Sequence, residues 1–81
     1  MRIRALFFAT YRDLAGADEI SVDLPTGASI ADLVDHLRGR GGAWASLPDR
    51  PAVALNLTYS RLAAALSEGD EVAFIPPVSG G

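Results

Sequence analysis

The sequence has no cysteine and no lysine among its 81 residues, and its single histidine is His36. Without cysteine, the chain can form no disulfide, no thiolate metal site and no cysteine nucleophile. Without lysine, the α-amino group is the only amine nucleophile that the chain offers. Because His36 has no second histidine or cysteine near it, we expect it at the flank of a helix or in solvent rather than bound to a metal. The sequence therefore predicts no metal site.

Long apolar runs and basic clusters are also absent. No apolar run approaches the ~20 residues that a membrane span requires. Residues 1–4 include two arginines but lead into no signal-peptide pattern. The seven arginines are scattered and the net charge is −3, which argues against nucleic acid as a partner. We therefore expect a cytoplasmic protein that binds neither membranes nor nucleic acid.

The chain also lacks the side chains of an internal active site. It has no Ser/His/Asp set at a supporting spacing, and no glycine-rich loop between a strand and a helix. Asp32 and Asp35 share a predicted helix, but a solvated helix face explains them better than catalysis. Apolar residues are plentiful at 49%, enough for the small core of one domain. The composition favours a carrier over an enzyme.

Apolar periodicity predicts strands at residues 2–9, 19–24, 52–57 and 71–75, with a short return strand beginning near Tyr59. We expect a short helix with Thr10 as its N-cap, Tyr11 packed beneath it and Gly16 as its stop. A longer helix is predicted over residues 29–38, with Ser29 as its cap and Asp32 in its first turn. Its apolar stripe consists of Ile30, Leu33, Val34 and Leu37.

This order of elements predicts an α+β fold. The first two strands form an antiparallel pair, the long helix crosses one face, and the last strand pairs parallel with the first in the middle of the sheet. That layout is a β-grasp, or ubiquitin-like, fold: a mixed sheet with one long helix across one face. Residues 1–75 form the domain, and residues 76–81 form an extended C-terminal tail. The second face of the sheet is open.

Alternation places four apolar side chains on the open face: Leu6, Phe8, Tyr59 and Ile75. A contiguous apolar cluster of this kind indicates a protein interface. The alternative is that the chain's own loop around Trp44 covers this face. Arg12 is a candidate contact to an acidic partner, although an ordinary solvated position is the alternative.

The tail reads Pro76, Pro77, Val78, Ser79, Gly80 and Gly81. The two prolines fix φ and favour an extended start. The four residues after them can span ~13 Å, enough to enter a narrow channel. Glycine lacks a Cβ and lets another molecule approach the backbone closely. A frayed terminus is the alternative, but it explains neither the paired prolines nor the paired glycines. We therefore expect the terminal carboxylate of Gly81 to be the functional group.

Four segments together resemble a known family: LFFA at 6–9, RDLAG at 12–16, ALN at 54–56 and GDEVAFIPPVSGG at 69–81. The chain is similar over nearly its whole length to the MoaD-type sulfur carrier, the small subunit of molybdopterin synthase in the MoaD/ThiS family. The run 69–81 is the most specific part. Leu57 departs from the pattern, because the family often has a polar turn residue there.

The resemblance implies a mechanism in which the Gly81 carboxylate is adenylated by an ATP-dependent activating enzyme. Sulfur from a donor protein then replaces AMP and gives a C-terminal thiocarboxylate. The carrier docks on the large synthase subunit in a heterotetramer and passes sulfur to cyclic pyranopterin monophosphate, which builds the dithiolene of molybdopterin. The resemblance implies no bound cofactor, and catalytic residues on the large subunit. The partner-binding residues would be Phe8, Arg12, Tyr59, Ile75, Pro76, Pro77, Val78 and Ser79, with Gly80 and Gly81 reactive.

Three other functions remain open at this point. One is a sulfur carrier for another pathway, such as thiamine thiazole synthesis. Another is a ubiquitin-like modifier whose C-terminal glycine joins a lysine of a target protein. The third is a β-grasp adaptor that binds through its sheet and never activates its tail.

Overall fold

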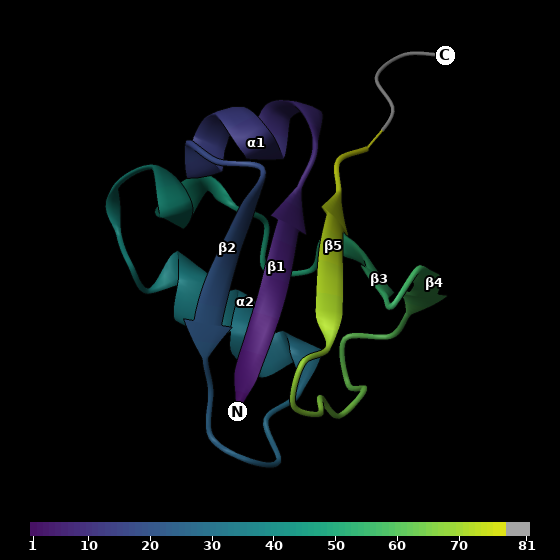
Figure 1. Cartoon of the computed structure of the whole chain (residues 1–81). Helices are drawn as coiled ribbons and strands as arrows, with labels where there is room; N and C mark the ends of the chain where they lie inside the picture. The colour runs from purple at the N-terminus through teal and green to yellow at the C-terminus, as the bar shows by residue number, and fades with distance from the viewer. Residues whose placement is uncertain (78–81) are drawn as a thin grey trace.

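The computed structural model describes residues 1–77, which form one mixed sheet with helices packed against it (Figure 1). The strands are β1 (Arg2–Phe7), β2 (Glu19–Asp23), β3 (Ala52–Leu55), β4 (Thr58–Ser60) and β5 (Glu71–Ile75). Their order is β2-β1-β5-β3-β4. β1 and β5 pair in parallel, whereas the other neighbours pair antiparallel. The predicted β-grasp fold is confirmed, including the central parallel pair.

The main helix, α2 (Ile30–Arg38), crosses one face of the sheet (Figure 1). It begins with a capping box. The Ser29 hydroxyl accepts from the Asp32 N–H at 3.2 Å, and the Asp32 carboxylate accepts from the Ser29 N–H at 2.9 Å. The predicted apolar stripe of this helix is fully buried. Residues 1–77 include no helix that is long and apolar enough to cross a membrane.

Two shorter helices complete the structure, α1 (Ala9–Ala15) and the 3-10 helix η1 (Gly42–Ser46). Trp44, in η1, is half-buried and packs edge-on against Phe7, with ring centroids 5.5 Å apart. Phe7 also stacks on Phe74 at 5.3 Å, in the core beneath the helices. Because Trp44 packs on the inward face of the sheet, it does not cover the open face. The alternative of self-cover by this side chain is therefore wrong.

Two local predictions are also wrong. Thr10 is not the cap of α1, because the helix begins at Ala9 with Phe8 at the N-cap position and no side-chain cap. Ala9 has a positive φ of 48°, so the chain turns directly after β1. The helix therefore begins before Thr10, the polar residue from which its start was predicted. Leu57 is not in the third strand. It is 88% exposed in a two-residue turn with Asn56, where both residues have positive φ, as type I′ hairpin turns require.

Candidate docking site

The strand register gathers the apolar residues of the open face near the edge where the tail begins. β1 and β5 are parallel, so both end at the same edge of the sheet (Figure 1). Leu6 pairs with Ala73, which pairs on its other side with Ala54, which in turn pairs with Tyr59. Small alanine side chains thus fill the middle of the face, and larger apolar side chains stand around them.

Leu6, Phe8, Tyr59 and Ile75 are named the docking patch below. Phe8 is 49% exposed and Tyr59 is 76% exposed, whereas Leu6 and Ile75 are half-buried. Phe8 directly follows β1, and Ile75 ends β5. The structure places Leu6, Tyr59 and Ile75 on the open face, as alternation predicts, and Phe8 at the edge where β1 ends. Their role in binding a partner stays a prediction.

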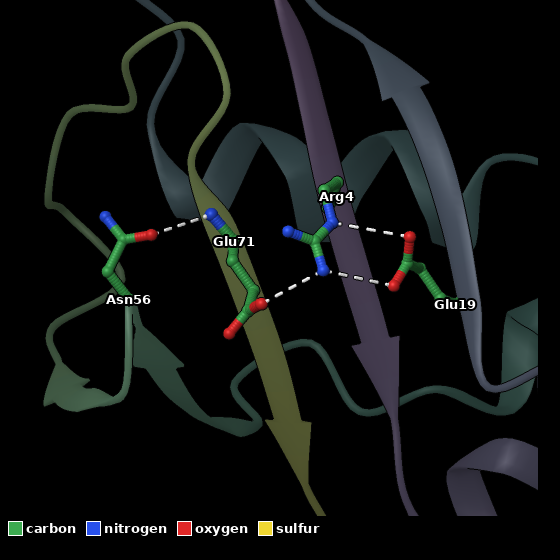
Figure 2. A network of polar contacts seen from close by, with 4 residues as sticks. All are labelled: Arg4, Glu19, Asn56 and Glu71. Atoms are coloured by element: carbon green, nitrogen blue, oxygen red, sulfur yellow. Dashed lines mark hydrogen bonds and ion pairs between the residues drawn. The ribbon is translucent and has the colours of Figure 1, made fainter.

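The opposite half of the open face is charged and internally paired (Figure 2). The Arg4 guanidinium donates to both Glu19 carboxylate oxygens, at 3.3 and 3.2 Å, and also lies 3.2 Å from Glu71. The hydrogen bond to Glu19, followed by the charge of Glu19, raises the pKa of Arg4 above its ordinary value, and Glu71 adds a smaller effect. Arg2 pairs with Asp23 in the same way at 3.4 Å. Exposed ion pairs of this kind contribute little stability. They do show that the charged side chains of this half are paired with one another, whereas the other half of the face is apolar.

Asn56 fixes the start of β5 beside this charged half (Figure 2). Its side-chain oxygen accepts from the Glu71 N–H at 2.9 Å, and its backbone N–H donates to the Glu71 carbonyl at 2.8 Å. Its side-chain nitrogen also donates to Asp70 at 3.0 Å. The strand that leads to the tail is therefore held at its first residue by the β3–β4 turn.

Arg12 lies beside the docking patch. Together with Leu6 and Phe8 it lines a hollow of about 300 Å³. Its guanidinium is 3.7 Å from the Asp18 carboxylate, and its side chain is 58% exposed. Its charge is thus partly compensated within the chain. Contact with an acidic partner stays a prediction for Arg12.

A second hollow, of about 460 Å³, lies at the base of the tail and is called the tail-base hollow below. Its lining consists of Tyr11, Pro48, Arg50, Pro51, Ala52, Tyr59, Ile75, Pro76 and Pro77. Pro76 is half-buried and Pro77 is exposed. Two of the docking patch residues therefore also border this hollow, together with both prolines of the tail.

Tyr11 and Arg50 are site residues that sequence reasoning missed. Tyr11 is only 6% exposed, in agreement with its predicted core position, yet it also lines the tail-base hollow. Its burial raises the pKa of its phenol above the ordinary value of a tyrosine. Arg50 lies between two prolines that follow η1, and no periodic pattern marks it. Only packing brings these two residues beside Pro76.

The predicted reactive residues Gly80 and Gly81, together with Val78 and Ser79, lie outside the described residues. In residues 1–77, no group of three or more histidine, cysteine or acidic side chains is arranged to hold a metal ion. Within residues 1–77, the site consists of a partly exposed apolar surface at the edge of the sheet where the tail begins.

Comparison with known proteins relates the chain to carriers of sulfur. The sequence model of the ThiS family matches residues 5–81. The molybdopterin synthase sulfur carrier subunit of Chlamydomonas reinhardtii is 41% identical over 83 residues, covering 100% of both chains. The protein of the same name from Escherichia coli is also 41% identical, covering 98% of this chain and 99% of its own.

Among solved structures, this chain is similar to SAMP1 of Haloferax volcanii, the small archaeal modifier protein 1. The two have a TM-score of 0.86 and 32% sequence identity, and the match covers 100% of each chain. The ubiquitin-like sheet and helix arrangement therefore extends to a protein named as a modifier.

Proposed function

Because the chain belongs to the ThiS family, we propose that it is the sulfur carrier subunit of molybdopterin synthase. The observation that carries this proposal is the position of the tail relative to the docking patch. β5 lies in the middle of the sheet and leads through Ile75 into Pro76 at the edge that holds the patch. A partner that binds the patch is thus placed to take up the C-terminal glycines. The full-length similarity to two proteins named as such carriers supports the choice of pathway.

The proposed reaction begins at the Gly81 carboxylate. An activating enzyme transfers AMP from ATP to this carboxylate and releases pyrophosphate. Sulfur that a donor protein delivers at the sulfide level then attacks the acyl carbon and displaces AMP, which leaves a thiocarboxylate at the C-terminus. An acyl adenylate hydrolyses readily, so it must form in a closed pocket. Gly80 and Gly81 suit such a pocket because they add no side chain to the backbone.

The second half of the cycle takes place on the large synthase subunit. The carrier docks through its patch, the tail enters the active site of the large subunit, and sulfur passes to cyclic pyranopterin monophosphate. Because a dithiolene contains two sulfur atoms, two transfers are needed for each product. In each transfer the sulfur forms a bond to a pterin carbon, and water then cleaves the acyl carbon–sulfur bond, which returns the carrier to its carboxylate form. The general acids and bases of this reaction are expected on the large subunit.

The proposal is tested by reconstitution with purified activating enzyme, ATP, sulfur donor, large subunit and pterin precursor. Intact-mass spectrometry should show one oxygen of the carrier replaced by sulfur, and the carrier should then return to its original mass as the dithiolene product forms. Deleting Gly81 should abolish both signals, and Gly81→Ala should slow them sharply. Full sulfur transfer by the deleted protein would refute the proposed role of Gly81.

A second candidate function is protein modification, which the similarity to the small archaeal modifier protein favours. In that case the activated Gly81 would form an isopeptide bond with a lysine of a target. The same mass measurement separates the two functions. Isopeptide adducts mark a modifier, whereas an oxygen-to-sulfur exchange marks a carrier.

A further inference from the structure

The tail-base hollow is lined by both apolar and polar side chains. Residues from five separate parts of the chain form it: α1, the segment after η1, β3, β4 and the end of β5. Proline, alanine and isoleucine side chains dominate its lining. Tyr11, Tyr59 and Arg50 supply two phenols and one guanidinium. Tyrosine and arginine are the residue types that most often dominate binding energy at protein interfaces, together with tryptophan.

Arg50 is the cation in the lining of this hollow, and it has no ion-pair partner among residues 1–77. No carboxylate within residues 1–77 lies within ion-pair distance of it, whereas Arg2, Arg4 and Arg12 each have such a partner. Arg50 is also exposed. A guanidinium at the rim of an apolar hollow is matched by a carboxylate on a bound protein, because the pair forms with both groups partly removed from water.

The length of the tail limits how far from the hollow a protein that takes up Gly81 can lie. Pro76 and Pro77 form part of its wall. The four residues beyond Pro77 reach at most ~13 Å. A protein that takes Gly81 into an active site must therefore approach Pro77, which lines the hollow, within about that distance. Tyr59 and Ile75 make the hollow continuous with the docking patch.

We propose that the tail-base hollow receives an apolar side chain of the large synthase subunit, with a neighbouring carboxylate of that subunit paired to Arg50. This inference rests on the proposed function, because it takes the large subunit as the occupant. It assigns to Arg50 a role in affinity, separate from the chemistry at Gly81. The contact fixes the carrier at the root of its tail, so the tail enters the active site from a set direction.

The test compares Arg50→Glu with Arg61→Glu, a matched control. Arg61 is also exposed, has no ion-pair partner in residues 1–77 and lines none of the hollows described for this chain. Both variants change the charge equally. Calorimetric titration of each carrier into the purified large subunit should show affinity at least about tenfold weaker for Arg50→Glu and within about twofold of wild type for Arg61→Glu. Arg50→Gln should fall between them.

A second pair of variants tests whether the hollow receives an apolar side chain, without changing the charge of the carrier. Ala52 lines the hollow and is exposed, so Ala52→Phe fills the space without disturbing the core. It should weaken binding by about tenfold, because the phenylalanine ring occupies the space that the apolar side chain of the large subunit would fill. Ala63→Phe, at an exposed position that lines none of these hollows, should leave binding unchanged. Circular dichroism melting curves should match wild type for all of these variants.

The outcomes separate this inference from the proposed function. Equal affinities for Arg50→Glu and Arg61→Glu, or unchanged binding by Ala52→Phe, would overturn the inference while wild-type sulfur transfer stands. A variant defective only in adenylation would also overturn it, because the occupant would then be the activating enzyme. Failure of the wild-type carrier to bind the large subunit at all would instead refute the proposed function.

Discussion

Phe8→Ala is expected to weaken docking on the large subunit by about 30-fold. Phe8 exposes 49% of its surface beside Leu6. A phenylalanine side chain buries ~150–250 Å², so about 100 Å² remains available to a partner. At ~25 cal/mol per Å² this area corresponds to about 2.5 kcal/mol, or about 2 kcal/mol once the retained Cβ is deducted. A loss of about 2 kcal/mol is a factor of about 30 in Kd.

The fold should tolerate this change. Phe8 is outside the buried core. It caps the start of α1 only through its backbone carbonyl, which accepts from the Tyr11 N–H at 3.0 Å, and alanine keeps this group. The melting temperature of Phe8→Ala should therefore stay close to that of wild type. Adenylation by the activating enzyme provides a second check that the tail is still competent.

Leu57→Ala is the matched control for Phe8→Ala. Leu57 is 88% exposed, but its turn lies beside the start of β5, at the end of that strand away from the tail. Binding is measured by calorimetry or biolayer interferometry against immobilised large subunit. An unchanged Kd for Phe8→Ala, or an equal loss for Leu57→Ala, would show that the docking patch is on the wrong surface.

Three other outcomes are expected. Asn56→Ala should lower the free energy of unfolding by about 1–3 kcal/mol in urea denaturation, because it removes the side-chain bonds to Asp70 and Glu71 at a residue with φ of 49°; Asn56→Gly, which accepts that φ, should cost less. Tyr11→Phe should remove a phenol titration step above about pH 10, because burial raises the pKa of Tyr11. The folded protein keeps this proton to higher pH than the unfolded chain, so wild-type stability should fall as the pH rises through the raised pKa, and this fall should be smaller in the variant. Carrier incubated with activating enzyme and ATP but no sulfur donor should form no multimers on a denaturing gel, because the chain has no lysine and its α-amino group donates to the Leu24 carbonyl at 2.6 Å.

Much of the fold could be predicted from short-range patterns. Alternation along β1, β2 and β5 specified which side chains face inward, and Ser29 with Asp32 specified where α2 begins. These signals are local, because a strand repeats every two residues and a cap acts within one helical turn. Prediction failed in the short connections between elements, where the backbone conformation is set by the elements that they join. Ala9 and Leu57 adopt positive φ, although neither residue type favours it.

The candidate site also has parts that could be predicted from the sequence and parts that only the tertiary structure shows. The paired prolines and glycines of the tail, and the apolar positions of the docking patch, are legible in the sequence, because chain stiffness, backbone access and alternation are properties of neighbouring residues. The register that inserts Ala54 and Ala73 between Leu6 and Tyr59 depends on three strand pairings. Likewise, the sequence leaves open on which side of the sheet Trp44 lies. The structure shows that it packs against Phe7, on the inward face.

By itself, the sequence predicted a small β-grasp domain and a C-terminal tail in which paired prolines precede two glycines. The tertiary structure decided that Tyr11 and Arg50 meet Pro76 in a hollow at the root of that tail. The reason is the range of the forces involved. Periodicity and caps act over a few residues, whereas a hollow exists only where segments far apart in the chain pack around the same space and leave it unfilled.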